Sequence, residues 1–297
     1  MNIRNGARCV SSLMAYTRIG RLLAGAALLA SLAACSPILI LNTFVPTGAL
    51  EIRRDVAYGS HPRQRLDVYR PREAHEPAPV VVFFYGGNWR SGDRAGYLFV
   101  AEALASRGFA VVVPDYRLYP EVTFPAFVDD AAAAVAWTAR HAGEFGGDPR
   151  RLFVMGHSAG AHLAAMVALD GRYLAAQGLA PGAVAGLIGI AGAYDFLPLT
   201  SETLKLTFPE ETRASSQPIA FVTSRAPPAL LAAGKNDATV RVGNMRRLAA
   251  RMREQGVPVT EVIYPDAGHV AILARLAAPL RANQPLLDEI ERFVLAR

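Results

Sequence analysis

Residues 151–160 read Arg-Leu-Phe-Val-Met-Gly-His-Ser-Ala-Gly, and an alanine-rich run follows them over 161–168. The first five residues are mostly apolar, as in a strand buried on both faces, and the alanine-rich run favours a helix. A sharp turn between such a strand and helix needs small residues at Gly156 and Gly160, and it leaves the hydroxyl between them exposed above the sheet. We therefore expect Ser158 to be a nucleophile at the carboxyl end of a central strand.

Further apolar runs alternate with helical stretches along the chain. Strands that alternate with helices of this length imply crossover connections and a mostly parallel sheet covered on both faces. The predicted fold class is therefore α/β, a three-layer sandwich formed by one domain over residues 51–297. We predict strands over residues 79–85, 109–113, 151–155, 187–191, 229–233 and 259–264, and helices over 97–106, 127–141, 159–168, 242–255 and 286–295.

The composition of the 297 residues excludes several classes of protein. Hydrophobic residues make up 52% and charged residues 19%, which is unlike a disordered chain. Of the 31 basic residues, four lie in the first 34 positions, which hold no acid, so the remainder has 27 basic and 25 acidic residues. That near balance argues against nucleic-acid binding, which needs a clustered positive charge. The two cysteines, Cys9 and Cys35, provide neither a disulfide framework nor a cysteine-based zinc site, and no metal is predicted.

The amino terminus has the pattern of an export signal. Arginines precede an uncharged run, 22–34, that ends in small residues before Cys35. Residues 32–35, Leu-Ala-Ala-Cys, resemble the bacterial lipobox, in which the cysteine is acylated and becomes the first residue. We therefore expect residues 1–34 to be a lipoprotein signal peptide, lipidated Cys35 to attach the protein to a membrane, and residues 35–50 to be a tether. Serine rather than aspartate after the cysteine favours the periplasmic face of the outer membrane.

Two other interpretations of this segment stay open. Residues 22–41 form an uncharged run of 20 residues, long enough to span a bilayer as an uncleaved anchor, although Pro37 disfavours such a helix. An ordinary cleaved secretory signal is the third alternative. All three predict export, and the first two predict attachment to the membrane.

A serine hydroxyl needs a base to attack at neutral pH, and histidine is the natural choice. Among the six histidines His269 is the best candidate, because it follows the predicted strand 259–264 in a loop near the end of the chain. His157 and His162 lie on the turn and its helix, where we expect that their rings cannot reach the serine in the direction of attack. The other three lie before the core or in polar, surface-like surroundings: His61, His75 and His141.

The third member of such a site must accept a hydrogen bond from the imidazole and fix its tautomer. Asp237 follows the predicted strand 229–233 and gives the chain order serine, acid, histidine. Asp195, after the preceding strand, and Asp266, three residues before the histidine, are the alternatives.

Residues 85–89, Tyr-Gly-Gly-Asn-Trp, follow the first buried strand and are candidates for an oxyanion hole. Glycines let the backbone approach the substrate, and an acyl-transfer site needs preorganised N–H donors. We expect these donors to be the amides of Gly87 and Asn88, together with the amide of Ala159 after the nucleophile. Trp89 is a candidate substrate-binding residue, and packing against the core is the alternative role for its side chain.

With these residues placed, the sequence from about Arg65 to the carboxyl terminus resembles the α/β-hydrolase superfamily. Within it, the chain is similar to the carboxylesterase group that includes feruloyl-esterase-like and kynurenine-formamidase-like proteins. One position differs from the pattern of that group. Where this chain has Tyr85, the group usually has a histidine that supports the oxyanion loop. The resemblance implies an α/β-hydrolase sandwich with a small cap within residues 194–225. The motifs that carry it are Asp115–Leu118 with Pro120 and Glu121, Phe124–Ala126 with Asp129, Gly156–Leu163, and Pro227-Pro228.

Together the residues and the resemblance predict an exported serine hydrolase that cleaves small-molecule carboxylic esters without a metal or organic cofactor. An aryl-formamidase would use the same residues on an amide. A lipid-anchored binding protein that has kept the fold without turnover is the alternative from another class. The natural ester and the oligomeric state are not predicted.

Overall fold

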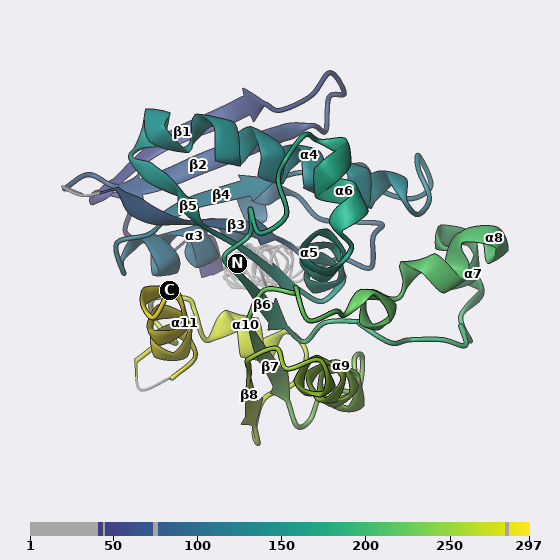
Figure 1. Cartoon of the computed structure of the whole chain (residues 1–297). Coiled ribbons are helices and arrows are strands. Elements are labelled where there is room, and N and C mark those ends of the chain that lie inside the picture. The colour runs from purple at the N-terminus through teal and green to yellow at the C-terminus, as the bar shows by residue number, and fades with distance from the viewer. Residues whose placement is uncertain (1–40, 44, 74–76, 283–284) are drawn as a thin grey trace, which may run out of the picture.

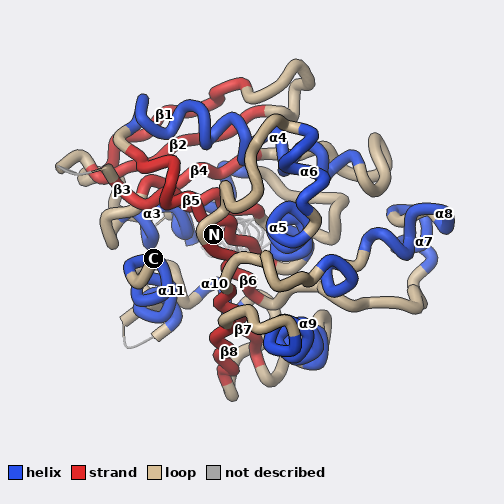
Figure 2. Tube along the Cα trace, in the orientation of Figure 1, coloured by secondary structure: helices blue, strands red, loops and turns tan. Residues whose placement is uncertain are grey.

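The computed structural model describes residues 41–43, 45–73, 77–282 and 285–297. These residues form one eight-stranded sheet between layers of helices (Figures 1 and 2). The three-layer α/β class is therefore confirmed. The predicted signal peptide and Cys35 lie outside the described residues, so the lipoprotein hypothesis stays a prediction. The strands are β1 (Leu50–Ala57), β2 (Arg65–Pro71), β3 (Ala78–Phe84), β4 (Ala110–Pro114), β5 (Gly147–His157), β6 (Gly186–Ile190), β7 (Ala229–Gly234) and β8 (Val259–Tyr264).

The sheet has the order β1-β2-β4-β3-β5-β6-β7-β8. All six predicted strands are present, and from β4 to β8 every pair of neighbours is parallel. The sequence pattern missed β1 and β2, which add to the edge of the sheet in antiparallel orientation. The outermost strand, β1, carries three consecutive exposed charged residues, 53–55, and therefore lacks the apolar run by which the buried strands are recognised.

Helices cover both faces of the sheet (Figure 1). One layer contains α4, α5, α6 and α9, and the other contains α3 and α11. The five predicted helices are present with ends that differ by one residue or less. The structure adds four short helices that the pattern did not predict. The α-helices whose bounds the structure describes are α3 (Leu98–Ala105), α4 (Ala126–His141), α5 (Ala159–Leu169), α6 (Gly171–Ala176), α7 (Glu202–Thr207), α8 (Glu210–Arg213), α9 (Gly243–Glu254), α10 (Ala271–Ala274) and α11 (Leu286–Leu295).

The centre of the sheet is the hydrophobic core. Every residue of β3 and β4 is buried, because a parallel sheet with helices on both faces leaves neither face to water. Helix α5 packs on β5, β6 and β3 and beside α4, and nearly all its residues are buried, which explains the predominance of alanine and other apolar residues in it. The strand and the helix that flank Ser158 are thus held in the buried core.

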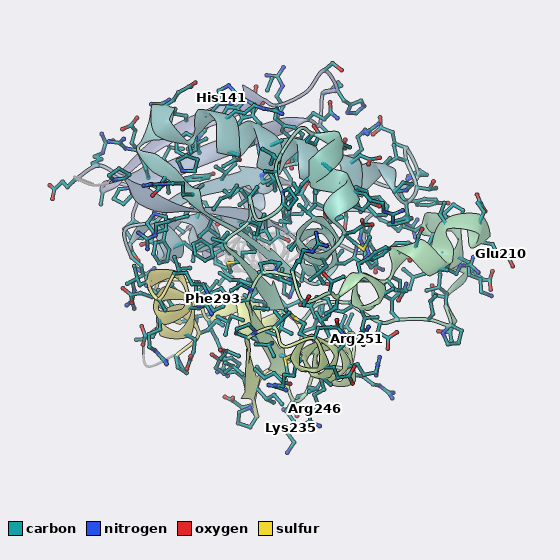
Figure 3. All side chains as sticks on the ribbon, viewed as in Figure 1. His141, Glu210, Lys235, Arg246, Arg251 and Phe293 are labelled. Carbon is teal, nitrogen blue, oxygen red and sulfur yellow. The ribbon has the colours of Figure 1, made fainter. Side chains whose placement is uncertain are left out.

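The segment between β6 and β7 forms a small cap, as the resemblance implied. Helices α7 and α8 extend from the side of the molecule, and Glu210 on α8 lies at its outer edge (Figures 1 and 3). Phe208, which follows α7, is fully buried and packs against Trp89 of the predicted oxyanion loop. The cap is therefore attached to that loop by an apolar contact.

The carboxyl-terminal part of the predicted tether contacts the domain. The Asn42 side chain donates a hydrogen bond to the Ala95 carbonyl oxygen at 2.7 Å and accepts one from the Phe99 amide at 3.1 Å. Leu41 and Val45 are half-buried against the core. Leu41, Asn42 and Val45 thus pack on the domain although they lie before the predicted boundary at position 51. No helix in the described ranges combines the length and the hydrophobicity that crossing a bilayer requires.

Candidate active site

Ser158 lies in the sharp turn between β5 and α5. Its backbone has φ 56° and ψ −122°, a conformation that is strained for a residue with a side chain. A Cβ atom on Gly156 would lie 2.2 Å from the Gly160 carbonyl oxygen, and one on Gly160 would lie 2.0 Å from the Phe84 carbonyl oxygen. Only glycine fits at either position, which explains the two glycines around the serine. The turn projects the hydroxyl beyond the carboxyl end of the sheet.

Three side chains from three strand ends meet at this hydroxyl. The Ser158 Oγ lies 2.8 Å from the Nε2 atom of His269, in the loop after β8. The Nδ1 atom of the same ring lies 2.7 Å from the Oδ2 atom of Asp237, in the loop after β7. With the Nδ1–H donating to the carboxylate, the Nε2 lone pair faces the hydroxyl and can accept its proton. The sequence-predicted serine, histidine and aspartate therefore form a hydrogen-bonded series in which the imidazole lies between the hydroxyl and the carboxylate.

The aspartate is held by the backbone that follows it. The Asp237 Oδ1 atom accepts hydrogen bonds from the amides of Thr239 at 2.9 Å and Val240 at 2.8 Å, and its side chain is fully buried. Oδ2 is left to accept the hydrogen bond from His269. These two backbone donors were not predicted, because no side-chain pattern reports them.

The two alternative acids bind arginines instead. Asp195 pairs with Arg247, and its backbone carbonyl accepts a 2.7 Å hydrogen bond from the same guanidinium. Asp266 is exposed and pairs with Arg275 at 2.8 Å, and this hydrogen bond lowers the pKa of the carboxyl. In the part of the chain that the structure describes, neither the Asp195 nor the Asp266 carboxylate forms a hydrogen bond with His269. The geometry thus favours Asp237 over both.

The predicted oxyanion loop folds beside the serine. Gly87 has φ +129°, and a Cβ atom there would lie 2.0 Å from the Ser91 carbonyl oxygen. Asn88 and Ser158 line the same cavity, and Ala159 begins α5, where amides have no partner within the helix. No acceptor in the described part of the chain binds the amides of Gly87, Asn88 or Ala159. The amides of these three predicted donors thus have no protein acceptor among the residues described, as an oxyanion hole requires.

Tyr85 replaces the loop-supporting histidine with a phenol inside a buried network. Its hydroxyl donates to Asp115 Oδ1 at 2.7 Å and accepts from Arg63 at 2.9 Å. The same Arg63 binds the Gly92 carbonyl oxygen at 3.0 Å, and the same Asp115 oxygen accepts from the Arg94 amide at 2.8 Å. The side chains of Arg63 and Asp115 therefore connect Tyr85, at the start of the loop, to Gly92 and Arg94 at its end. Burial, and then the neighbouring Tyr116 and Asp115, raise the pKa of Tyr85 well above its ordinary value.

Trp89 packs in the interior. It is 3% exposed and does not line the cavity beside Ser158. Its Nε1–H donates to His162 Nδ1 at 3.2 Å, and the other nitrogen of that ring donates to the Ser216 carbonyl oxygen in the cap at 2.8 Å. The structure thus favours packing over substrate contact for the indole, because aromatic rings of the cap and of α4 cover it.

A cavity of about 910 Å³ opens at the serine. Its walls come from the loop 86–97 after β3, from His157 and Ser158, and from Thr239, His269 and Val270. Val270 is 46% exposed and places an apolar side chain next to the imidazole. In the described ranges no three metal-binding side chains lie close enough together to hold an ion. The cavity therefore offers a nucleophile, a base and backbone donors to a small organic substrate.

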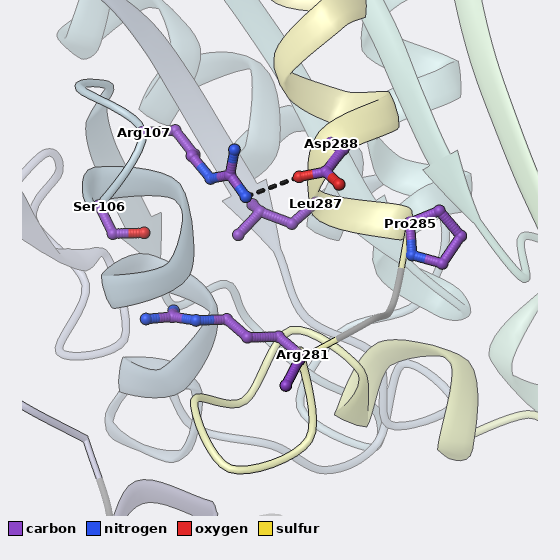
Figure 4. A pocket seen from close by; sticks show the side chains of 7 residues that line it. Ser106, Arg107, Arg281, Pro285, Leu287 and Asp288 are labelled. Carbon is purple, nitrogen blue, oxygen red and sulfur yellow. Dashed lines mark hydrogen bonds and ion pairs between the residues drawn. The ribbon is translucent and has the colours of Figure 1, made fainter.

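A second hollow, of about 840 Å³, lies at the ends of α3 and α11 (Figure 4). Its arginines are already paired: Arg107 binds Asp288 at 2.6 Å and Arg281 binds Glu102 at 2.7 Å. Ser106 donates its hydroxyl to the Ala103 carbonyl oxygen at 2.7 Å. The residues described there include no activated nucleophile, so the chemistry belongs to the first cavity.

Buried histidines should make the protein sensitive to acid. Burial, and for His157 also the charge of His269, lowers the pKa of both His157 and His162 from 6.5 to about 4. In the unfolded chain the two imidazoles become protonated as the pH falls below 6.5, whereas in the folded chain they stay neutral until the pH falls to about 4. Each ring should therefore remove about 3 kcal/mol of stability across that window. Urea unfolding of the wild type and His162→Gln at pH 7, 6, 5 and 4 measures this, and the variant should lose stability less steeply. Equal slopes would contradict the burial of His162 as a neutral ring.

Comparison with known proteins gives matches over most of the domain. The family model described as BD-FAE matches residues 66–252. The esterase LipC of Mycobacterium tuberculosis is 34% identical over 267 residues, which cover 81% of this chain and 66% of LipC. The isoprenylcysteine alpha-carbonyl methylesterase ICME of Arabidopsis thaliana is 28% identical, over 83% of this chain and 62% of its own length. This chain thus spans about two thirds of the length of these curated relatives.

Solved structures share the fold. The Pyrobaculum calidifontis esterase superposes with a TM-score of 0.71 at 26% identity, over 87% of this chain and 89% of that chain. Esterase 2 of Thermogutta terrifontis gives a TM-score of 0.69 at 25% identity, over 84% of this chain and 96% of that chain. Both match over most of their length, so the described domain shares the fold of these two esterases.

Proposed function

Because the chain belongs to the BD-FAE family of α/β-hydrolases, we propose that it hydrolyses carboxylic esters through an acyl-enzyme on Ser158. The observation that carries the proposal is the hydrogen-bonded series from Ser158 through His269 to Asp237, at the wall of a cavity. The relatives named as esterases support the same class of reaction.

The proposed reaction has two halves. In the first, Ser158 Oγ attacks the ester carbonyl while His269 Nε2 takes its proton, and the amides of Gly87, Asn88 and Ala159 stabilise the oxyanion. His269 then gives the proton to the leaving alcohol, and the C–O bond of the ester breaks. In the second half, His269 takes a proton from water as the water oxygen attacks the acyl carbonyl. His269 then returns that proton to Ser158 Oγ as the bond between the acyl carbon and Oγ breaks, which releases the carboxylic acid and the free serine. Asp237 stays ionised and stabilises the imidazolium in both halves.

A substrate panel on the full chain tests the proposal. The panel contains short-chain and long-chain acyl esters, acetylated and feruloylated sugars, and N-formylkynurenine, with Ser158→Ala as the blank. We expect ester hydrolysis above the blank and labelling of wild-type Ser158 by a fluorophosphonate. A rate on N-formylkynurenine well above every ester would instead assign the site to an aryl-formamidase. A wild type that neither turns over nor reacts with the probe would be a binding protein.

We propose further that the protein is exported and held at a bacterial membrane by acylated Cys35. The support is the sequence of residues 22–35, an uncharged run that ends in Leu-Ala-Ala-Cys. Each buried methylene of a fatty acyl chain adds about 0.8 kcal/mol of membrane affinity, so several chains would make the attachment essentially permanent.

Changing the cysteine should release the protein from the detergent phase. In the host envelope, full-length wild type should partition into detergent, and Cys35→Ser should move to the aqueous phase because it cannot be acylated. Phase separation followed by blotting measures the two fractions, and Cys9→Ser is the matched control. Partitioning of Cys35→Ser identical to wild type would indicate an uncleaved anchor, and an aqueous wild type would indicate an ordinary secretory signal.

A further inference from the structure

His157 is a buried histidine that the proposed reaction does not use. It precedes the nucleophile, is 4% exposed, and its ring lies against that of His269 with centroids 4.9 Å apart. Its Nε2 atom lies 2.9 Å from the backbone carbonyl oxygen of His269. A carbonyl oxygen only accepts hydrogen bonds, so Nε2 carries the proton and donates it.

The other ring nitrogen fixes the charge of His157. Nδ1 is buried and has no hydrogen-bond partner in the described part of the chain. It faces Gly86, where a Cβ atom would come within 3.1 Å of it. A second proton would therefore sit on an unpartnered nitrogen beside His269, which becomes a cation during catalysis. The ring stays neutral, in agreement with the lowered pKa of about 4.

The His269 loop has few other restraints at this point. The Asn236 amide donates to the Ala267 carbonyl oxygen at 3.0 Å, and the Ile272 amide donates to that of Gly268 at 3.2 Å. For the His269 carbonyl, His157 is the one donor among the residues described. The hydrogen bond thus connects the backbone of His269, the base, to His157, which directly precedes the nucleophile Ser158.

We propose that His157 is a positioning residue that holds the His269 backbone so that the imidazole faces both Ser158 and Asp237. The inference rests on the proposed function, because it assigns the support of the same base. A neutral donor suits this role, since it restrains the loop without repelling the imidazolium. Loss of the hydrogen bond should let the loop move and lengthen the contact between Nε2 and the hydroxyl, which slows proton transfer.

The test uses three replacements in the full chain. The Gln side chain places an N–H donor as many bonds from Cβ as Nε2 of histidine, the shorter Asn side chain does not reach as far, and Leu has no donor. We expect His157→Leu and His157→Asn to lower kcat by about 10- to 100-fold with KM within twofold, since misplacement of about 1 Å costs up to about 10². His157→Gln should return kcat to within about threefold of wild type. His141→Leu, at the carboxyl end of α4 (Figure 3) and not among the residues that line the cavity, is the matched control and should leave both constants unchanged.

The outcomes separate this inference from the proposed function. Fluorophosphonate titration counts competent Ser158 in each sample, and kcat is expressed per labelled site, so loss of folded protein does not imitate loss of positioning. An unlabelled wild type would overturn the proposed function itself. With a labelled wild type, a Gln variant as slow as Leu, or a Leu variant as fast as wild type, would overturn the role of the hydrogen bond. If His157→Leu fails to fold, the comparison of Gln with Asn decides the question.

Discussion

Ser158→Ala should lower kcat for ester hydrolysis by about 10⁶-fold, because the nucleophile and its covalent intermediate are lost together. The backbone amides and the cavity would remain, so a residual rate above that of water is expected. Alanine removes one oxygen atom from a fixed turn and leaves the glycines around it untouched. The variant should therefore fold and bind substrate with KM close to that of the wild type.

Steady-state hydrolysis of an activated short-chain ester and fluorophosphonate labelling measure the loss. Ser106→Ala is the matched control, since its hydroxyl bonds to the Ala103 carbonyl oxygen in the second hollow, away from the site. It should keep both turnover and labelling. A Ser158→Ala protein that still turned over at a few per cent of the wild-type rate, or still reacted with the probe, would show that another group is the nucleophile.

Asp237→Asn should lower kcat by about 10³- to 10⁴-fold through the wrong tautomer of His269. The present Oδ1 position accepts two backbone N–H groups, so the amide oxygen of asparagine would occupy it. The NH₂ group would then face His269 Nδ1 and donate to it, which would place the ring proton on Nε2. That nitrogen could no longer accept the proton of Ser158.

The two other carboxylates provide matched controls for this change. Asp195→Asn and Asp266→Asn remove charges of the same kind that are paired with Arg247 and Arg275, and neither should change kcat more than about twofold, the size of an exposed ion pair's contribution. The kcat of the three variants, measured on one ester, decides between them. A large loss in Asp195→Asn with a mild one in Asp237→Asn would overturn the assignment of the acid.

The buried strands and the strand-to-helix turn were predictable from sequence, because their signals are local. An apolar run such as β3 is recognisable since both of its faces are covered, and Gly156 and Gly160 mark the close approach of backbone around Ser158. The edge strand β1 was not predictable in this way, because it exposes charged residues and is a strand only through its pairing with β2.

The roles of side chains that contact distant segments could not be predicted from the sequence. The side chain of Trp89 suited a cleft wall or a core position, and the aromatic residues of the cap decide for the core. The sequence gives His157 no role as the base, because its ring is not expected to reach the serine. Its hydrogen bond to the His269 carbonyl oxygen joins residues 112 positions apart. The one local signal for that contact is a histidine inside an otherwise apolar strand end, which is an ambiguous pattern.

The phenol of Tyr85 has a consequence for alkaline media. An imidazole in its place would change its hydrogen-bonding pattern on losing or gaining a proton in ordinary buffers. Burial raises the pKa of the Tyr85 phenol well above its ordinary value, so its hydroxyl remains a hydrogen-bond donor to Asp115 throughout the range in which an imidazole titrates. The phenol therefore adds no titration step to the oxyanion loop in neutral or mildly alkaline buffer. A hydrolytic rate that is not lowered by titration of this loop in alkaline buffer is the behaviour that tyrosine at position 85 permits.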